Sequence, residues 1–232
     1  MQATLAALAR WDGVACFTRL YLAVTEGVQS RLVGVDFQDP RFLERLDIAF
    51  ADLFFNALET FRRDPSAAPP AWLPLFQARS RHGVAPVQFA LAGMNAHINR
   101  DLPVALVTTC REFGISPVEG SSQHADYERI NQLLATVEAR VKRQYLSGWL
   151  RSIDRLLHRV DRLDDVVAMW DISRARDAAW INAEALWAVR DNADLFDRYL
   201  ATLDRMVGFA GRGLLVPADT WSQRFARTLR LA

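Results

Sequence analysis

The chain of 232 residues is long enough to bury a sizeable core, and its 51% hydrophobic and 24% charged residues are typical of an ordinary globular protein. A formal net charge of +1 argues against a nucleic-acid binder, since such proteins usually carry a basic stripe along the phosphate track. No apolar run approaches the ~20 residues that a membrane-spanning helix needs, so we expect no membrane span.

Helical periodicity dominates the first part of the chain. Apolar residues recur in steps of three and four from Val14 to Val28, which predicts a helix with one buried face. Asp39 and Pro40 form a capping residue and a first-turn proline, so a second helix is expected to begin there. Its apolar stripe runs out at Asp64.

A proline-rich stretch follows at residues 65–86, with five prolines. We interpret it as an excursion across a single domain and not as a linker, because Trp72, Leu75 and Phe76 give it an apolar anchor. A short helix is expected at about residues 72–80.

The next helix is expected from Pro86 to about Asp101. Pro103 should end or kink it, because proline disfavours helical geometry at the residue before it. Helix is then expected to resume toward Phe113, followed by a break over residues 114–120.

The second half of the chain also shows helical spacing. Ser121 and Ser122 can cap a long helix, whose apolar face runs from Tyr127 to Trp149 with a pattern that reaches Leu157. Further helices are expected at about 161–170, 172–190 and 192–210, with a short final helix from Pro217 toward Leu231. The sequence therefore predicts an all-α fold: one domain over residues 1–232, built as a bundle of about seven to nine helices.

The two cysteines indicate the compartment. Cys16 and Cys110 lie among apolar residues without a C-x-x-C pair, so we expect two reduced core thiols. The first ten residues lack the cationic start and apolar core of a signal peptide. A cytoplasmic protein is the prediction.

The segment from Gln88 to Pro103 is the most informative part of the sequence. On helical spacing, one broad face of it carries six apolar residues and three polar ones, which are Asn95, His97 and Asp101. Burying polar groups costs free energy unless they are paired. We therefore expect these three side chains to point into the protein and to have partners there.

His97 and Asp101 are four residues apart, so their side chains are neighbours on a helix. Three uses of such a pair remain open. Asp101 can orient and charge-stabilise His97 as a general base, both can bind one metal ion, or the two can form a structural hydrogen bond.

A second polar group follows Ser121. His124, Tyr127 and Asn131 share one helix face, and Asp126 lies on its flank. Asp126 can simply complement the helix dipole, and His124 can be a capping or core histidine. The functional alternative brings His124 to His97 and Asp101 inside the bundle. If a divalent metal is present, its predicted ligands are His97, Asp101, His124 and Asp126.

Two charged residues interrupt apolar stripes elsewhere. Asp47 lies between Leu43 and Phe50, and Arg176 is in line with Trp180. A buried Asp47–Arg176 pair would satisfy both charges. Alternatively, Arg176 holds a substrate anion or steadies Asp101.

Several of these segments resemble a known family. They are Trp11-Asp12-Gly13-Val14, the run G-M-N-A-H-I-N-x-D-L-P from Gly93 to Pro103 with its flank from Gln88, His124-x-Asp126-Tyr127 with Asn131, and Arg176-x-x-x-Trp180. The sequence resembles bacterial domain-of-unknown-function family 5995 over most of its length. The resemblance implies a helical domain and supplies no catalytic assignment.

The hypothesis with the widest support in the sequence is a small-molecule enzyme with an interior pocket. His97, Asp101 and His124 would be catalytic, and a fairly apolar substrate would contact Asn95, Tyr127, Asn131 and Arg176. The chemistry would be proton transfer, cyclisation or elimination, or a metal-assisted hydrolysis. No nucleotide, flavin or haem motif is present. The alternatives are a module that binds a hydrophobic ligand without chemistry and an interaction protein with a buried polar network.

Overall fold

The computed structural model describes residues 1–32, 34–150 and 171–217, with side chains described up to residue 137 in the long helix that ends at residue 150. Within these ranges all regular secondary structure is helical, and there are eight helices when one long rod is counted once. The all-α bundle of seven to nine helices is therefore confirmed. That residues 1–232 form one domain stays a prediction, and the helices expected at 161–170 and after Pro217 lie outside the described residues.

The elements follow the expected order along the chain. They are α1 (Gln2–Ala6), α2 (Gly13–Gln29), α3 (Pro40–Arg63), α4 (Leu73–Ala78), α5 (Pro86–Ala96), the π-helical segment η1 (His97–Asp101), α6 (Leu102–Phe113), α7 (Ser122–Leu150), α9 (Ile172–Ala188) and α10 (Ala193–Leu214).

The helix starts show why the boundaries could be predicted. The side chain of Asp12 accepts a hydrogen bond from the N–H of Val14 at the start of α2, and Asp39 accepts one from Phe42 at the start of α3. Both carboxylates occupy the capping position, where an otherwise unpaired N–H needs an acceptor. At the other end of α6, Gly114 adopts φ 66°, the left-handed cap that stops a helix.

Pro103 does not end the helix near Asp101, and the irregularity that precedes it is a π turn. The chain is helical without a break from Pro86 to Phe113, because α5, η1 and α6 form one rod. In a regular α-helix Pro103 would clash with the carbonyl four residues earlier and leave it unpaired. The π turn changes the register just before the proline, which then lies in the first turn of α6, where a missing N–H is tolerated.

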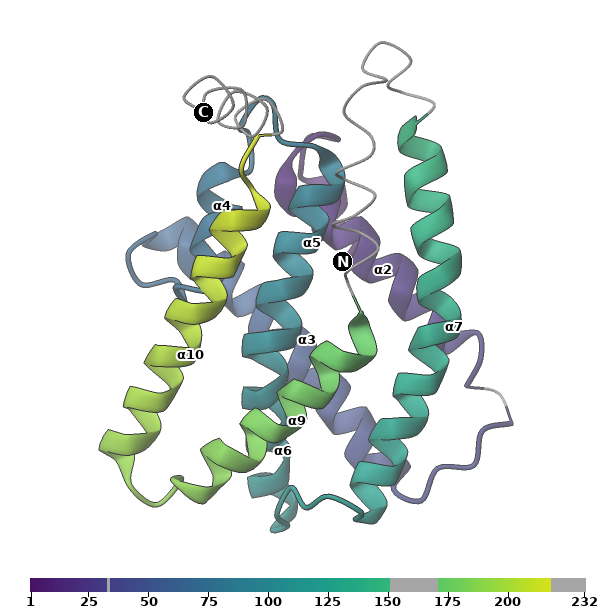
Figure 1. The fold of residues 1–232 in the computed structure, drawn as a ribbon, viewed down its shortest axis with the longest axis vertical. Helices are drawn as coiled ribbons and strands as arrows, with labels where there is room; N and C mark the ends of the chain where they lie inside the picture. The colour runs from purple at the N-terminus through teal and green to yellow at the C-terminus, as the bar shows by residue number, and fades with distance from the viewer. Residues whose placement is uncertain (33, 151–170, 218–232) are drawn as a thin grey trace, which may run out of the picture.

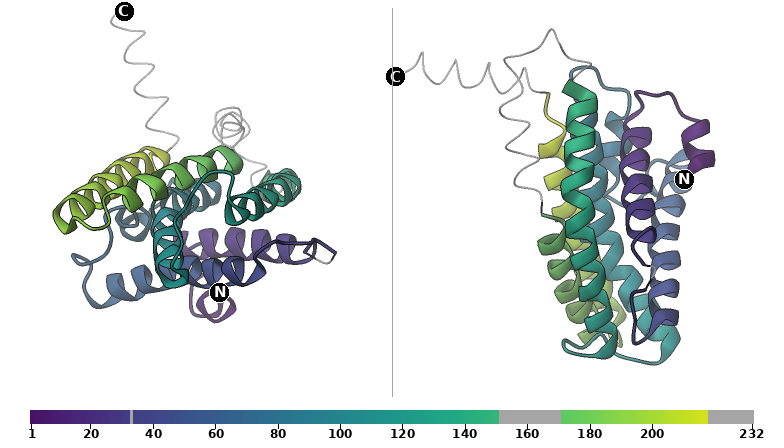
Figure 2. Two further views of the ribbon diagram at one scale, coloured as in Figure 1. Left: turned by 90° about the horizontal axis from the view of Figure 1, so that it is seen from below. Right: turned by 90° about the vertical axis from the view of Figure 1, so that its right-hand side faces the viewer.

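The α5–η1–α6 rod is the centre of the molecule. Helices α2 and α3 pack on one side of it and α9 and α10 on the other, as Figures 1 and 2 show. Helix α7 contacts α2, α3 and α9, so it closes one side of the bundle. This arrangement surrounds η1 with α3, α9 and α10, which places His97 and Asp101 deep in the protein.

The close packing of α5 on α2 depends on one glycine. A Cβ atom added to Gly93 would lie 2.3 Å from the ring of Phe17, which is fully buried and contacts Trp72 and His97. The ring has little room to give way, because it packs against Tyr21, Phe54, Trp72 and His97.

Gly93→Ala is expected to lower the free energy of unfolding by about 1–3 kcal/mol through overpacking against Phe17. Chemical denaturation measures this. Gly213→Ala is the matched control, because a methyl group at this exposed helical position would have no other atom within 4 Å. The control should be neutral or stabilise by about 0.5–1 kcal/mol. An equal effect of the two substitutions would contradict close packing at Gly93.

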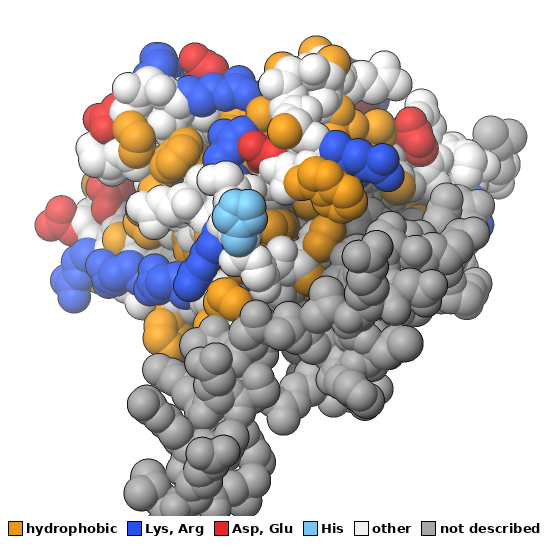
Figure 3. All heavy atoms as spheres, turned by 90° about the horizontal axis from the view of Figure 1, so that it is seen from above, with side chains coloured by type: hydrophobic (Ala, Val, Ile, Leu, Met, Phe, Trp, Pro, Cys, Tyr) orange, Lys and Arg blue, Asp and Glu red, His pale blue; other side chains and the backbone are white. Residues whose placement is uncertain are grey.

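Figure 3 shows one end of the bundle, where basic, acidic and hydrophobic side chains are interspersed. None of the helices that the structure describes is both long enough and apolar enough to cross a membrane.

Candidate functional site

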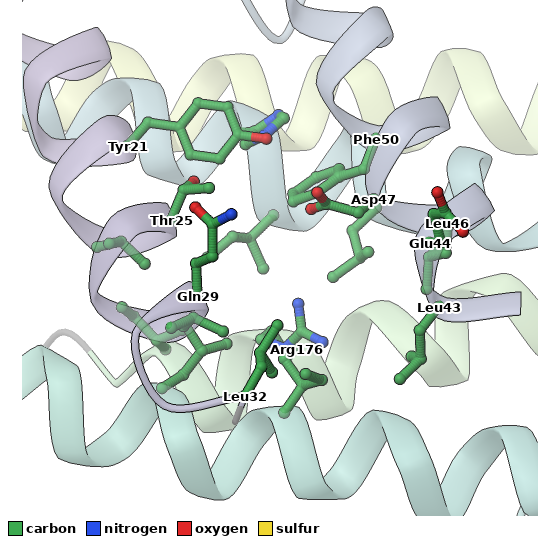
Figure 4. Close-up of a pocket in the computed structure, with 18 of the residues that line it drawn as sticks. Tyr21, Thr25, Gln29, Leu32, Leu43, Glu44, Leu46, Asp47, Phe50 and Arg176 are labelled. Atoms are coloured by element: carbon green, nitrogen blue, oxygen red, sulfur yellow. The ribbon is translucent and has the colours of Figure 1, made fainter. Parts of the chain in front are cut away.

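A cavity of about 540 Å³ lies among α2, α3, η1, α7 and α9. Its size is within the range of small-molecule pockets. Figure 4 shows side chains reaching it from α2 and α3, with Arg176 entering from α9. Most of the wall is aliphatic or aromatic, and the polar side chains that line it are Tyr21, Thr25, Gln29, Glu44, Asp47, His97 and Arg176.

The expected contact between His97 and Asp101 is present. Nδ1 of His97 lies 3.2 Å from Oδ2 of Asp101, and the two side chains are 1% and 0% exposed. Both belong to η1, and π-helical turns occur frequently at functional sites. The pair therefore forms an interior histidine–carboxylate dyad whose imidazole lines the cavity.

The partners of Asp101 fix the tautomer of His97. Asp101 accepts hydrogen bonds from Nε1 of Trp72 at 3.0 Å and from Arg100 at 3.0 Å, and both of these groups can only donate. Since Asp101 accepts from two groups that can only donate, we assign the shared proton to Nδ1 of His97, which then donates to Oδ2 of Asp101. Nε2 then carries a free lone pair, and it has no hydrogen-bond partner among the described residues.

Aromatic rings enclose the imidazole of His97. Phe50 stacks on it with ring centroids 3.6 Å apart and planes within 7°, and the ring of Tyr21 lies 4.6 Å away. Burial lowers the pKa of His97, although Asp101 and Asp47 act in the opposite direction. Burial, together with the charges of Asp47 and Asp101, raises the pKa of Tyr21. The site thus holds a neutral imidazole beside a phenol that keeps its proton.

Asp47 and Arg176 do not form the direct buried pair that was one of the two alternatives. No ion pair joins them among the described residues, and both line the cavity, from α3 and α9 (Figure 4). Asp47 is an exposed residue, yet desolvation at the cavity wall raises its pKa, while the charges of His97 and Arg176 lower it. The two charges therefore influence each other across open space and both remain available to a ligand.

Three residues expected to contact substrate do not line the cavity. Tyr127 and Asn131 stand behind Arg176: the guanidinium lies 4.2 Å over the Tyr127 ring, and its Nε donates to Oδ1 of Asn131 at 2.5 Å. Asn95 donates to the carbonyl of Val207 at 2.9 Å and so ties α5 to α10. Tyr127 and Asn131 position Arg176, and Asn95 is structural.

His124 does not join His97. Its ring packs on Trp180 at 4.7 Å, its Nδ1 accepts from the N–H of Gly120, and its Nε2 lies 3.9 Å from Glu128. None of these residues lines the cavity. The prediction that two segments meet in one catalytic centre is wrong, because His124 lies in the first turn of α7 and faces α9.

Asp126 connects α7 with the chain just before α3. Its carboxylate, fully buried, accepts hydrogen bonds from the N–H groups of Gln38 at 3.0 Å and Asp39 at 2.6 Å, just before α3. No group of three or more His, Cys, Asp or Glu in the described part of the chain could hold a metal ion. The four predicted metal ligands therefore do not form a site.

Sequence reasoning missed Tyr21 and Trp72, among other residues of the site. Tyr21 lies within the apolar stripe from Val14 to Val28, and Trp72 was named only as an apolar anchor of the proline-rich stretch. The signal that could have identified them is chemical: a buried tyrosine or tryptophan usually needs a partner for its O–H or N–H. For Trp72 that partner is Asp101.

The lowered pKa of His97 predicts how the free energy of unfolding depends on pH. The unfolded chain, with an ordinary histidine pKa of about 6.5, binds this proton first as the pH falls. The stability due to neutral His97 is therefore complete above about pH 6.5 and decreases below it, by at most about 1.4 kcal/mol per pH unit. Chemical denaturation at about pH 7.5 and about pH 5.5 measures the decrease.

The matched protein for this measurement is His97→Asn, which keeps the other titrating groups. Asp47 and Asp204, whose pKa values desolvation raises, act in the opposite direction and are present in both proteins. The difference between the two pH profiles reports His97 together with its charge interaction with Asp47. Identical profiles would show that His97 has an ordinary pKa in the folded state.

Neither the curated proteins nor the solved structures gave a match. The model of a family of unknown function, DUF5995, matches residues 1–217, which include the dyad, the cavity and Arg176. The chain belongs to the DUF5995 family.

Proposed function

We propose that this protein is an enzyme that uses His97 as a general acid–base on a small, largely apolar substrate bound in the cavity. The observation that carries the proposal is Nε2 of His97: a buried imidazole nitrogen without a partner among the described residues, on a ring whose other nitrogen lies against a carboxylate. Buried polar atoms are rarely left unsatisfied, and the exceptions need an explanation.

The dyad is suited to accept a proton and return it. When Nε2 takes a proton from the substrate, the imidazolium that forms is stabilised by the carboxylate of Asp101, which also accepts hydrogen bonds from Trp72 and Arg100. The protonated hydroxyl of Tyr21 is available as a donor to an oxygen that gains charge. Such a set supports isomerisation, elimination or cyclisation through proton transfer.

Access to Nε2 requires a small movement. The atom is enclosed by its neighbours, and the stacked ring of Phe50 covers one face of the imidazole. Phe50 also lines the cavity, so a substrate that displaces this ring gains contact with His97. Catalytic hydrogen bonds are often incomplete before the substrate binds, and the rearrangement would also exclude water.

The proposal is tested with a small-molecule extract of cells. Wild-type protein and His97→Asn are incubated with the extract, and compounds that disappear or form are followed by mass spectrometry. We expect the wild type to convert a compound of the extract and His97→Asn to lose this conversion. The variant should still bind the compound that the wild type consumes. Absence of any conversion by the wild type would contradict the proposal.

The second candidate function is a carrier of a hydrophobic ligand. The enclosure of Nε2 and the mainly apolar wall favour it. In that case the wild type and His97→Asn would both bind the same compound and leave it unaltered.

A further inference from the structure

Arg176 is a buried cation whose outer nitrogens face an open space. The residue is 7% exposed, and among the described residues only its Nε is engaged by a side chain, that of Asn131. Figure 4 shows the guanidinium end pointing into the cavity. No carboxylate among the described residues lies within ion-pair distance of it.

A charge in this position is expensive without a counter-charge. Buried arginines are normally paired, because desolvation of an isolated ion costs several kcal/mol. Here neighbouring side chains hold the guanidinium in position, and no counter-ion among the described residues pairs with it. The Tyr127 ring lies under the guanidinium, Asn131 holds Nε, and Asn131 itself donates to Glu128 and Asp177.

We propose that Arg176 binds the carboxylate of the substrate or ligand, so that the cavity takes molecules with a carboxylate head and an apolar body. The inference rests on the proposed function for the location of the site and extends it to the substrate class. With Nε occupied, the two terminal nitrogens present parallel N–H groups, which match the two oxygens of a carboxylate. The apolar side chains of the wall, such as Val24, Val28 and Leu134, would receive the body.

The other charges of the cavity favour a monoanion over a phosphate. Asp47 lines the same cavity and Glu44 contributes a second acidic side chain to its wall. A dianionic head would be repelled by both, whereas a carboxylate brings a single charge that Arg176 can balance.

The test compares head groups on one tail. Isothermal titration calorimetry of the wild-type protein with decanoate, decanamide and decyl phosphate measures the preference. We expect decanoate to bind about 10–100-fold more tightly than decanamide, since hydrogen bonds to charged groups contribute that much, and more tightly than decyl phosphate. Equal binding of decanoate and decanamide, or no binding of decanoate, would overturn the inference, and a preference for decyl phosphate would overturn it by assigning the site to phosphates.

Variants test whether Arg176 is the source of the carboxylate preference. Arg176→Gln should remove it and Arg176→Lys should retain a part, because lysine keeps the charge without the paired N–H groups. Arg174→Gln on the same helix is the control, since that side chain is 87% exposed. Asp47→Asn should strengthen decanoate binding about two- to fivefold by removing a like charge.

The result is separable from that for the acid–base proposal. His97→Asn should bind decanoate as the wild type does, because the proposed anchor for the carboxylate is Arg176 on another helix. A carboxylate preference without any conversion would support Arg176 as the carboxylate-binding residue and contradict the enzyme proposal. Conversion without this preference would support the enzyme proposal and contradict the role of Arg176.

Discussion

Asp101→Asn is expected to lower the free energy of unfolding by about 3–5 kcal/mol, the cost of removing one partner from a buried ion pair. Asp101 is fully buried and accepts from Trp72, Arg100 and His97. The amide keeps the shape but loses one of the two carboxylate charges that balance Arg100, the other being that of Asp204 at 3.3 Å. Urea denaturation measures the loss.

The same substitution should also impair the reaction. The amide that replaces the carboxylate would be able to donate to Nδ1 of His97, which would move the imidazole proton to Nε2 and block the base. In the serine protease triad this change of tautomer lowers kcat by about 10⁴, and we expect a loss of similar order in the conversion found with wild-type protein.

Glu112→Gln is the matched control for stability. It makes the same carboxylate-to-amide change in a bidentate pair with Arg45, at 2.5 and 2.7 Å, with side chains 39% and 37% exposed. An exposed pair of this kind contributes about 0–1 kcal/mol. If Asp101→Asn cost no more than this control, Asp101 would not be the counter-charge of a buried network.

The part of the site that could be predicted is local in sequence. His97 and Asp101 lie four residues apart on one element, so helical spacing alone places their side chains together. Asp39 and Asp12 were equally accessible to prediction, because a cap acts within three residues of itself. The same reasoning identified Arg176 as a polar interruption of an apolar face, and the structure places it at the cavity.

The part that could not be predicted depends on which helix faces which. The spacing of His124, Tyr127 and Asn131 indicates a buried face, and Tyr127 and Asn131 are indeed buried at 0% and 4% exposure. It does not say that this face meets α9, where Tyr127 donates to the carbonyl of Arg176. Nor does it say that Asp126 meets the start of α3, more than 80 residues away in sequence. Helical periodicity gives a direction around an axis and leaves the neighbour open.

The π turn was also beyond the reach of periodicity. The sequence carries a conflict between an apolar pattern that continues past Asp101 and Pro103, which opposes an α-helix. A break and a local change of register both resolve that conflict. The chain adopts the second, and as a result the dyad lies on the one segment of the rod with π-helical hydrogen bonding.

His97→Asn is expected to lower the rate of the conversion about 10²–10⁴-fold, the usual contribution of a general acid–base group. The substitution is selective, because the side-chain amide of asparagine can replace Nδ1 as a donor to Asp101 while nothing replaces Nε2. The rate constant is measured at saturating substrate for the wild type and the variant.

The control for this prediction is His82→Asn, the same substitution at an exposed histidine. It should leave the rate unchanged. Equal melting temperatures of wild type and His97→Asn at about pH 7.5 would show that a lost rate is not lost folding. A His97→Asn protein that converts the compound at the wild-type rate would remove the base from the reaction. The dyad would then be a structural pair, and the free nitrogen of His97 would have no catalytic use.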